Sequence, residues 1–192
     1  DVIMIGEIRD RETMSAAIAY AQSGHLCLAT LHANNSYHAL NRIVNFFPYD
    51  SRQSVLSDLS MCLRAVISQR LVRNVQGKQI PAVEILLNTS LIADLIKNDE
   101  IEKIRDAIEK SVSAGSQTFE RALYNLFKTG QITKEEAMRN ADSASNLSTL
   151  IDFSERTNTM KVPVFDPDRV TPQEPQPHSD FSGIKLNLDE PK

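Results

Sequence analysis

The chain has 192 residues, of which 41% are hydrophobic and 24% charged, and its formal net charge is −4. These values are typical of a globular protein that buries a real core. No apolar run approaches the roughly 20 residues that cross a bilayer, so a direct membrane span is excluded. No cluster of Lys and Arg is present to neutralise phosphates, which argues against a nucleic-acid partner.

The two cysteines, Cys27 and Cys62, each lie inside an apolar stretch. That placement indicates buried free thiols in a reducing cytoplasm rather than a disulfide framework. The chain begins at Asp1 and enters an apolar run almost at once, without a charged segment typical of a secretory signal. We therefore expect the C-terminal part of a longer protein.

The first predicted elements are a strand, a helix and a second strand. Residues 2–5 are a continuous apolar run ended by Gly6, which is typical of a strand buried on both faces of a parallel sheet. Apolar residues then recur at helical spacing over 14–21, and Gly24 is a natural helix terminator. Residues 26–31 are predicted as another buried strand, so the order indicates a parallel βαβ unit of the α/β class.

The middle of the chain is predicted as two helices and a hairpin. Apolar spacing indicates a helix over 40–47 and a longer helix over 51–71 that packs on the sheet. The segments 72–75 and 80–87 flank a Gln-Gly-Lys turn and predict a β-hairpin.

The pattern after the hairpin is helical. Apolar stripes predict helices over 92–96, 101–112 and 119–127. Thr133, followed three residues later by Glu136, has the sequence of a capping box and predicts the beginning of another helix.

Composition divides the chain into three parts. We expect the α/β core over 1–88, a helical region over 89–155 and a disordered Pro-rich tail over 156–192. Six of the eight prolines lie at 163–191, where almost no periodic apolar pattern occurs.

Two polar residues follow the two predicted parallel strands. Because parallel strands end at one sheet edge, where α/β sheets bind ligands, Glu7 and His32 should lie together. Glu7 is placed to hold the Mg²⁺ that bridges the β- and γ-phosphates of a nucleotide. His32 is placed to hydrogen-bond a terminal phosphate. The ordinary alternatives are a solvated carboxylate at a strand end and a histidine with local partners.

The other histidines and motifs give weaker indications of function. His25 begins the second strand and should lie at the opposite edge, while His38 is expected to be exposed. Zinc binding by His25, Cys27 and His32 is disfavoured, because His32 faces the other side of the strand. Neither Gly-x-x-x-x-Gly-Lys-Ser/Thr nor Gly-x-Gly-x-x-Gly occurs, so these residues include no phosphate-binding loop.

Several separated stretches resemble the secretion ATPases. Residues 1–13, Asp-Val-Ile-Met-Ile-Gly-Glu-Ile-Arg-Asp-Arg-Glu-Thr, are similar to their Walker B segment. Residues 23–33, Ser-Gly-His-Leu-Cys-Leu-Ala-Thr-Leu-His-Ala, are similar to their His box. Residues 66–71 with 82–87, and residues 129–137, resemble the pilus-retraction branch. The resemblance extends over residues 1–155.

This resemblance implies part of a RecA-like P-loop ATPase core within a homo-hexameric ring that binds ATP and Mg²⁺ at subunit boundaries. Glu7 takes the Walker B role and is the implied metal ligand. His25 and His32 are the implied His-box histidines, which makes these three the expected catalytic residues. The Walker A loop of the family would precede Asp1, and we therefore expect the 192 residues alone to be inactive.

The implied function is an ATP-hydrolysing motor subunit that drives type IV pilus retraction and twitching motility. Such a subunit is cytoplasmic and peripheral at the inner membrane, where its partners are a pilus platform protein and a principal retraction ATPase.

One departure from the family favours an alternative. Retraction ATPases carry Ala-Ile-Arg-Asn-Leu-Ile where residues 91–96 here are Leu-Ile-Ala-Asp-Leu-Ile. The chain thus resembles the accessory, PilU-like branch more than the principal, PilT-like one, and the alternative is a ring subunit acting mainly by binding a principal retraction ATPase. A third hypothesis, an unrelated helical adaptor, requires chance matches around Glu7 and His32.

Overall fold

The computed structural model describes residues 1–110 and 115–159, and it begins with a parallel βαβ unit. Strand β1 (Val2–Ile5), helix α1 (Arg11–Gln22) and strand β2 (Leu26–Ala29) follow in that order. The two strands pair in parallel, with Val2 opposite Leu26 and Ile5 opposite Ala29. Asp10 caps α1, because its carboxylate accepts a hydrogen bond from the Thr13 N–H at 2.8 Å. The predicted βαβ unit is confirmed.

The β1–β2 sheet is covered on one face, so the prediction of strands buried on both faces is wrong. Ile5 packs against the hydrophobic core. The opposite face is exposed at Val2 (62%), Met4 (78%), Leu26 (50%) and Leu28 (48%). Side chains alternate between the two faces of a strand, and the described helices cover only the face that carries Ile5. Cys27 and Cys62 are free thiols, half-buried rather than buried.

Helices α2 (Ser36–Asn45) and α3 (Tyr49–Cys62) follow, and the second of them corrects the sequence prediction. The predicted helix over 51–71 is wrong in its last part, because α3 ends at Cys62 and Leu63 has extended backbone angles. The chain then forms strand β3 (Ala65–Arg73), whose side chains alternate in exposure. Its β-branched residues suit a strand. Pairing with β4 decides between the helical period and the strand period, both of which the apolar residues fit.

Strands β3 and β4 (Gln79–Leu87) form a long antiparallel hairpin, which confirms the predicted hairpin and lengthens its first strand. The ladder runs from the Ala65–Leu87 pair to the Arg73–Gln79 pair. In the turn, Gly77 has a positive φ of 78°, which glycine adopts without steric cost.

The next helices, through α7, follow the predicted order, whereas α8 was not predicted as a separate helix. The helices after the hairpin are α4 (Ser90–Lys97), the 3₁₀ helix η1 (Ile101–Lys103), α5 (Ile104–Lys110), α6 (Phe119–Lys128), α7 (Lys134–Asn140) and α8 (Ala144–Thr159). Helix α8 continues past residue 155, into the range predicted as tail. Residues 111–114 and 160–192 lie outside the described part, so a disordered tail stays a prediction. No helix in the described ranges is both long and apolar enough to cross a bilayer.

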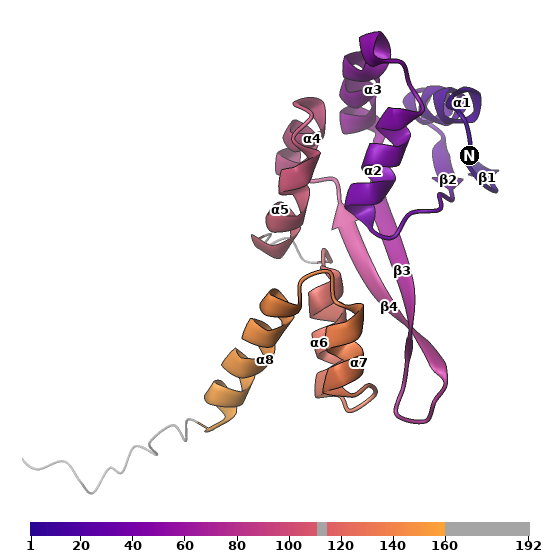
Figure 1. Cartoon of the computed structure of the whole chain (residues 1–192). Coiled ribbons are helices and arrows are strands. Elements are labelled where there is room, and N and C mark those ends of the chain that lie inside the picture. The colour runs from indigo at the N-terminus through magenta and orange to yellow at the C-terminus, as the bar shows by residue number, and fades with distance from the viewer. Residues whose placement is uncertain (111–114, 160–192) are drawn as a thin grey trace, which may run out of the picture.

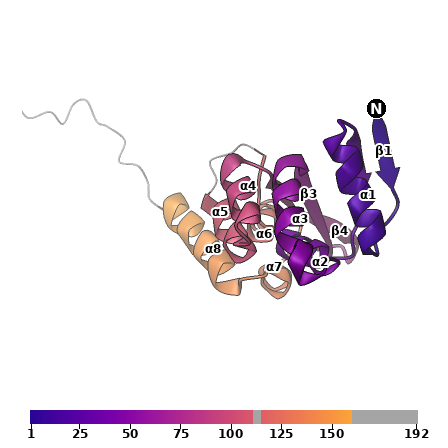
Figure 2. The same cartoon turned by 90° about the horizontal axis from the view of Figure 1, so that it is seen from above.

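Two hydrophobic clusters hold these elements together. Figures 1 and 2 show how the elements are arranged in two views. The first cluster contains residues of every helix from α1 through α5. Its members include Leu40, Leu56, Leu86 and Ile104. The second cluster joins α6, α7 and α8 and includes Phe119, Leu123, Ile132, Leu147 and Ile151.

The hairpin contributes to both clusters. Leu86 of β4 lies in the first, whereas Val72 of β3 and Ala82 of β4 lie in the second. Figure 1 shows the same arrangement. Helix α2 lies beside the end of the hairpin that is away from the turn, and α6 and α7 lie beside the part nearer the turn. The three-part division at residues 88 and 155 stays a prediction. In the structure α4 and α5 pack with the first cluster and α6 begins the second.

Candidate functional site

Glu7 and His32 come together because each follows a strand of one parallel pair. Beyond the strand ends, the Ile8 N–H donates to the Thr30 carbonyl at 2.9 Å. The Thr30 hydroxyl donates to the Gly6 carbonyl. These bonds keep the two chain segments side by side after the ladder ends, so both side chains project from the same sheet edge.

The Glu7 carboxylate has a different partner on each oxygen. Its Oε1 lies 3.1 Å from His32 Nε2. Its Oε2 accepts from Arg9, at 2.6 Å from Nε and 2.5 Å from Nη2. The Glu7 side chain is 21% exposed, whereas those of His32 and Arg9 are 80% and 75% exposed. The side chains of His32 and Arg9 are therefore open to solvent, where a bound ligand could replace Glu7 as their partner.

The surroundings keep Glu7 ionised. The hydrogen bond from Arg9 lowers the pKa of the Glu7 carboxyl, and the nearby charges of His32 and Arg42 act in the same direction. The bond to Glu7 correspondingly raises the pKa of Arg9. At neutral pH the site thus presents a carboxylate beside a guanidinium, the charge pattern that suits a cation bound to phosphate.

His25 directly precedes β2, so it lies at the opposite end of that strand from His32. The N–H of Leu26, the next residue, donates to the Asp1 carbonyl at the beginning of β1. The His25 Nδ1 lies 3.0 Å from the Ser23 hydroxyl, and its ring meets Tyr20 edge to face at 6.2 Å. The structure therefore brings Glu7 and His32 together and leaves His25 apart, so any role of His25 belongs to a separate contact.

An open depression of about 540 Å³ adjoins His32. Its lining residues are His32, Ala33, Asn34, His38, Asn41, Arg42, Asn45 and Phe46. Arg42 Nη1 donates to the His32 carbonyl at 3.1 Å, and its guanidinium carbon lies 5.9 Å from the centre of the Phe46 ring. The depression offers amide and guanidinium donors beside the Glu7–His32 pair.

Arg9 and Arg42 belong to this site and were missed by sequence reasoning. Arg9 lies two residues after Glu7, a spacing that was a usable signal for a carboxylate partner. Arg42 lies on α2, one element beyond His32, and only the fold reveals its contact with the His32 carbonyl.

The residues present fit Mg²⁺ bound to a nucleotide, and Glu7 is the carboxylate that would hold the ion. Mg²⁺ usually takes one or two protein carboxylates and fills its remaining positions with water and phosphate oxygens. Over residues 1–110 and 115–159, no group of three or more His, Cys, Asp or Glu side chains is placed to hold a metal ion. One ionised carboxylate at a sheet edge suits a cation that arrives with phosphate, although the 192 residues contain no glycine-rich loop whose backbone N–H groups would bind that phosphate.

Comparison with known proteins gives consistent matches. Residues 1–150 match the family model described as type II/IV secretion system protein. The chain is 52% identical over 152 residues to the type IV pilus ATPase PilU of Pseudomonas aeruginosa, which covers 79% of this chain and 40% of that protein. It is 36% identical over 146 residues to the type IV pilus retractation ATPase PilT of the same species, covering 76% of this chain and 42% of PilT.

Solved structures give the same picture. The crystal structure of the pilus retraction motor PilT with bound ADP superposes with a TM-score of 0.70 at 35% identity, covering 78% of this chain and 42% of that one. The ATPase DotB of Legionella pneumophila gives a TM-score of 0.62 at 28% identity, covering 71% of this chain and 37% of DotB. The chain spans less than half the length of each of these relatives.

Proposed function

The chain belongs to the type II/IV secretion system protein family, and from that membership we propose that it is part of an ATP-hydrolysing motor that drives type IV pilus retraction and twitching motility. One observation carries the proposal: Glu7 and His32 meet at the carboxyl ends of two parallel strands, at 3.1 Å. That edge is where α/β folds bind nucleotides. The likeness to the PilU and PilT ATPases supports it.

The residues of this chain have distinct roles in the proposed reaction. Mg²⁺ supplies positive charge that neutralises the charge developing on the transferred phosphate. Glu7 holds that ion, directly or through water, and Arg9 orients Glu7 through Oε2. His32 lies beside Glu7 with its ring open to solvent, where it can donate to a terminal phosphate and respond to its loss.

The assembly is part of the same proposal. Six copies of the full-length protein form a homo-hexameric ring in the cytoplasm, with ATP at the subunit boundaries. The ring lies peripherally at the inner membrane through a pilus platform protein, and nucleic acid is not a partner. His25, far from Glu7 and close to the first residue of the chain, is proposed to act at a subunit boundary rather than in the hydrolytic step.

A second candidate is an accessory ring subunit that works mainly by binding a principal retraction ATPase. Two observations favour it. Ala93 and Asp94 stand on α4 where the family resemblance predicts Arg and Asn, and Asp94 is exposed. Identity to the PilU relative, at 52%, also exceeds the 36% to PilT.

The test of the catalytic proposal is Glu7→Gln in the full-length protein. We expect ATP binding to stay nearly intact while turnover falls roughly 10²-fold or more, because the lost charge acts mainly in the transition state. Glu12→Gln, which neutralises an exposed carboxylate in the first turn of α1, is the matched control and should keep wild-type turnover. Unchanged turnover in Glu7→Gln would remove Glu7 from the site.

The two candidate functions separate in a mixing assay. ATP hydrolysis is measured for the full-length protein alone, for a principal retraction ATPase alone and for the mixture. A motor hydrolyses ATP alone. An accessory subunit hydrolyses little alone and changes the rate of the mixture.

A further inference from the structure

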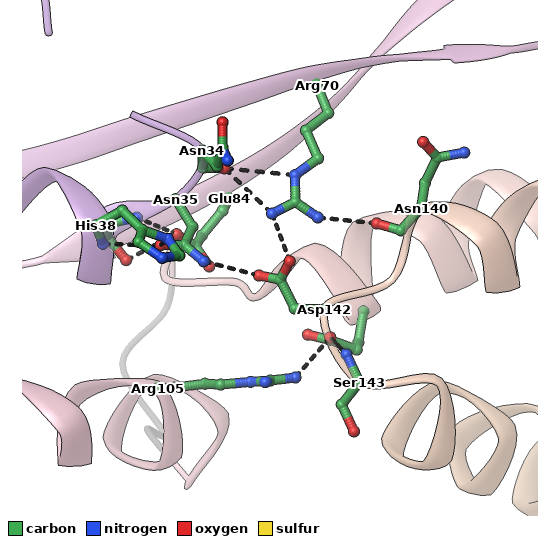
Figure 3. Close-up of polar contacts among 11 residues, drawn as sticks. Asn34, Asn35, His38, Arg70, Glu84, Arg105, Asn140, Asp142 and Ser143 are labelled. Atoms are coloured by element: carbon green, nitrogen blue, oxygen red, sulfur yellow. Dashed lines mark hydrogen bonds and ion pairs between the residues drawn. The ribbon is translucent and has the colours of Figure 1, made fainter. Parts of the chain in front are cut away.

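Arg70, midway along β3, connects two segments that are far apart in the sequence (Figure 3). Its Nε and Nη2 donate to the Asn34 carbonyl at 3.4 and 3.2 Å. Its Nη1 donates to the Asn140 carbonyl at 2.9 Å, and Nη2 lies 2.5 Å from Asp142 Oδ1. The guanidinium also stands 4.0 Å from the centre of the Phe119 ring. All of its nitrogens thus have partners, and these partners lie on two separate stretches of chain, at Asn34 and at 140–142.

Asp142 completes the connection from its second oxygen. Its Oδ2 accepts from Asn35 Nδ2 at 3.0 Å. The Oδ1 of the same Asn35 side chain accepts from the His38 N–H at 2.9 Å and so caps α2. One carboxylate therefore contacts both Arg70 and the residue that caps α2.

The segment that carries Asp142 is itself held from the other side. Glu120 of α6 is 4% exposed, and its Oε1 accepts from the Ser143 N–H and from Arg105 Nη2, both at 2.7 Å. Figure 3 shows Arg105 and Ser143 on the side of Asp142 that faces away from Arg70. The connection between α7 and α8 is therefore bonded to α5 and α6, and its Asp142 is the partner of Arg70 and Asn35.

These contacts reach the nucleotide site through the segment 30–35, which carries His32. Arg42 donates to the His32 carbonyl, and Arg70 donates to the Asn34 carbonyl two residues later. The side chains of Arg70 and Asp142 are 21% and 20% exposed. A pair so covered is screened less by salt than a surface pair, and charge-assisted hydrogen bonds are stronger than neutral ones.

We propose that Arg70 is a positioning residue for His32, and that through Asp142 it makes the segment 30–35 move together with the C-terminal helices α6–α8. The inference rests on the proposed ATPase function and deepens it. Arg70 contacts neither Glu7 nor the His32 side chain, so it would act by holding the segment that carries His32. The geometry requires arginine. Lysine keeps the charge but cannot reach two carbonyls and a carboxylate from one planar group.

The first test is a double-mutant cycle on ATP hydrolysis by the full-length protein. Arg70→Lys should lower kcat roughly 10-fold to 10²-fold with an unchanged KM for ATP, as a small misplacement of a catalytic group does. His32→Ala removes the group that Arg70 positions, so Arg70→Lys should cost nothing further in that background. Arg139→Gln breaks an exposed ion pair with Glu136 on α7 and is the control, expected to keep wild-type kcat.

The second test needs no hydrolysis. Amide hydrogen exchange over residues 33–38 is measured without nucleotide in the wild type and in Asp142→Asn, which is isosteric and lies 107 residues from Asn35. Exchange should rise roughly tenfold, the effect of losing a hydrogen bond to a charged group. The thermal unfolding midpoint of each variant shows whether it is folded.

The outcomes separate the inference from the function on which it rests. Additive losses of kcat in the cycle, or unchanged exchange over 33–38 in a folded Asp142→Asn protein, would overturn the inference alone. A folded full-length wild type without ATPase activity, alone and with a principal retraction ATPase, would overturn the proposed function and this inference together.

Discussion

Glu84 of β4, a residue with no sequence signal, contacts the beginning of α2 and combines burial with charge. It is 4% exposed, and its Oε1 accepts from the N–H and the hydroxyl of Ser36, both at 2.7 Å. Burial raises the pKa of the Glu84 carboxyl above its ordinary value of 4.5, although the bonds from Ser36 act in the opposite direction.

That pKa shift predicts a pH dependence of stability. Between 4.5 and the raised pKa, the folded protein binds more protons at Glu84 than the unfolded chain, so stability falls as the pH rises. Glu84→Gln keeps an oxygen for Ser36 and removes the titration. In the full-length protein, we expect the difference in unfolding midpoint, variant minus wild type, to grow more positive from acidic to neutral pH. A difference that is constant with pH would contradict this account.

Single residues also show which parts of the site could be predicted from the sequence. Glu7 and His32 were predictable because each follows a strand, and strand ends of a parallel pair share an edge. Arg70 was not predictable, since its partners on 34, 140 and 142 are brought together only by the fold. Sequence reasoning finds groups placed by local structure and misses groups placed by long-range packing.

Among the elements, α7 shows a local signal that is half right. The Thr133 hydroxyl accepts from the Glu136 N–H at 3.2 Å, as the predicted capping box requires. The Glu136 carboxylate does not return to Thr133. Its Oε1 accepts from the Arg73 N–H at the end of β3, at 2.9 Å. A side chain expected to close its own helix instead attaches that helix to the hairpin.

This cap gives a prediction at the element scale. Thr133→Ala should lower the free energy of unfolding by about 1 kcal/mol, because one N–H in the first turn of α7 loses its acceptor. Thr133→Ser keeps the hydroxyl and serves as the control. Denaturant unfolding of the full-length protein measures both, and equal stability of Thr133→Ala and the wild type would show that water replaces the cap without loss.

Strand β3 explains the main error in the predicted elements. Apolar residues at 56, 59, 63, 66 and 67 fit a helical period, yet the chain leaves the helix at Leu63 and pairs with β4 over nine residues. A short apolar run fits both periods, and only the partner strand decides. Helices α4, α5 and α6 were predictable because each carries its own apolar stripe, and α7 was predictable from its threonine cap. Helix α8 was not predicted as a separate helix.

For the whole molecule, the proposed function makes the described residues one side of a nucleotide site. The 192-residue chain has no glycine-rich phosphate loop, and backbone N–H groups of such a loop are the main donors to phosphates. We therefore expect no ATP binding at micromolar concentrations when this chain is titrated alone by calorimetry. Micromolar affinity would mean that the phosphates bind elsewhere on these residues, for example in the depression beside His32.

The β3–β4 hairpin has a mechanical consequence. Its strands, each nine residues long, run from the first hydrophobic cluster into the second. A ladder loaded along its strands resists in shear, since many hydrogen bonds share the force, whereas helices held by side chains peel away contact by contact. A tensile load applied through α8 would therefore detach the C-terminal helices first. The hairpin would stay intact as a rigid strut beside the βαβ unit that holds Glu7 and His32.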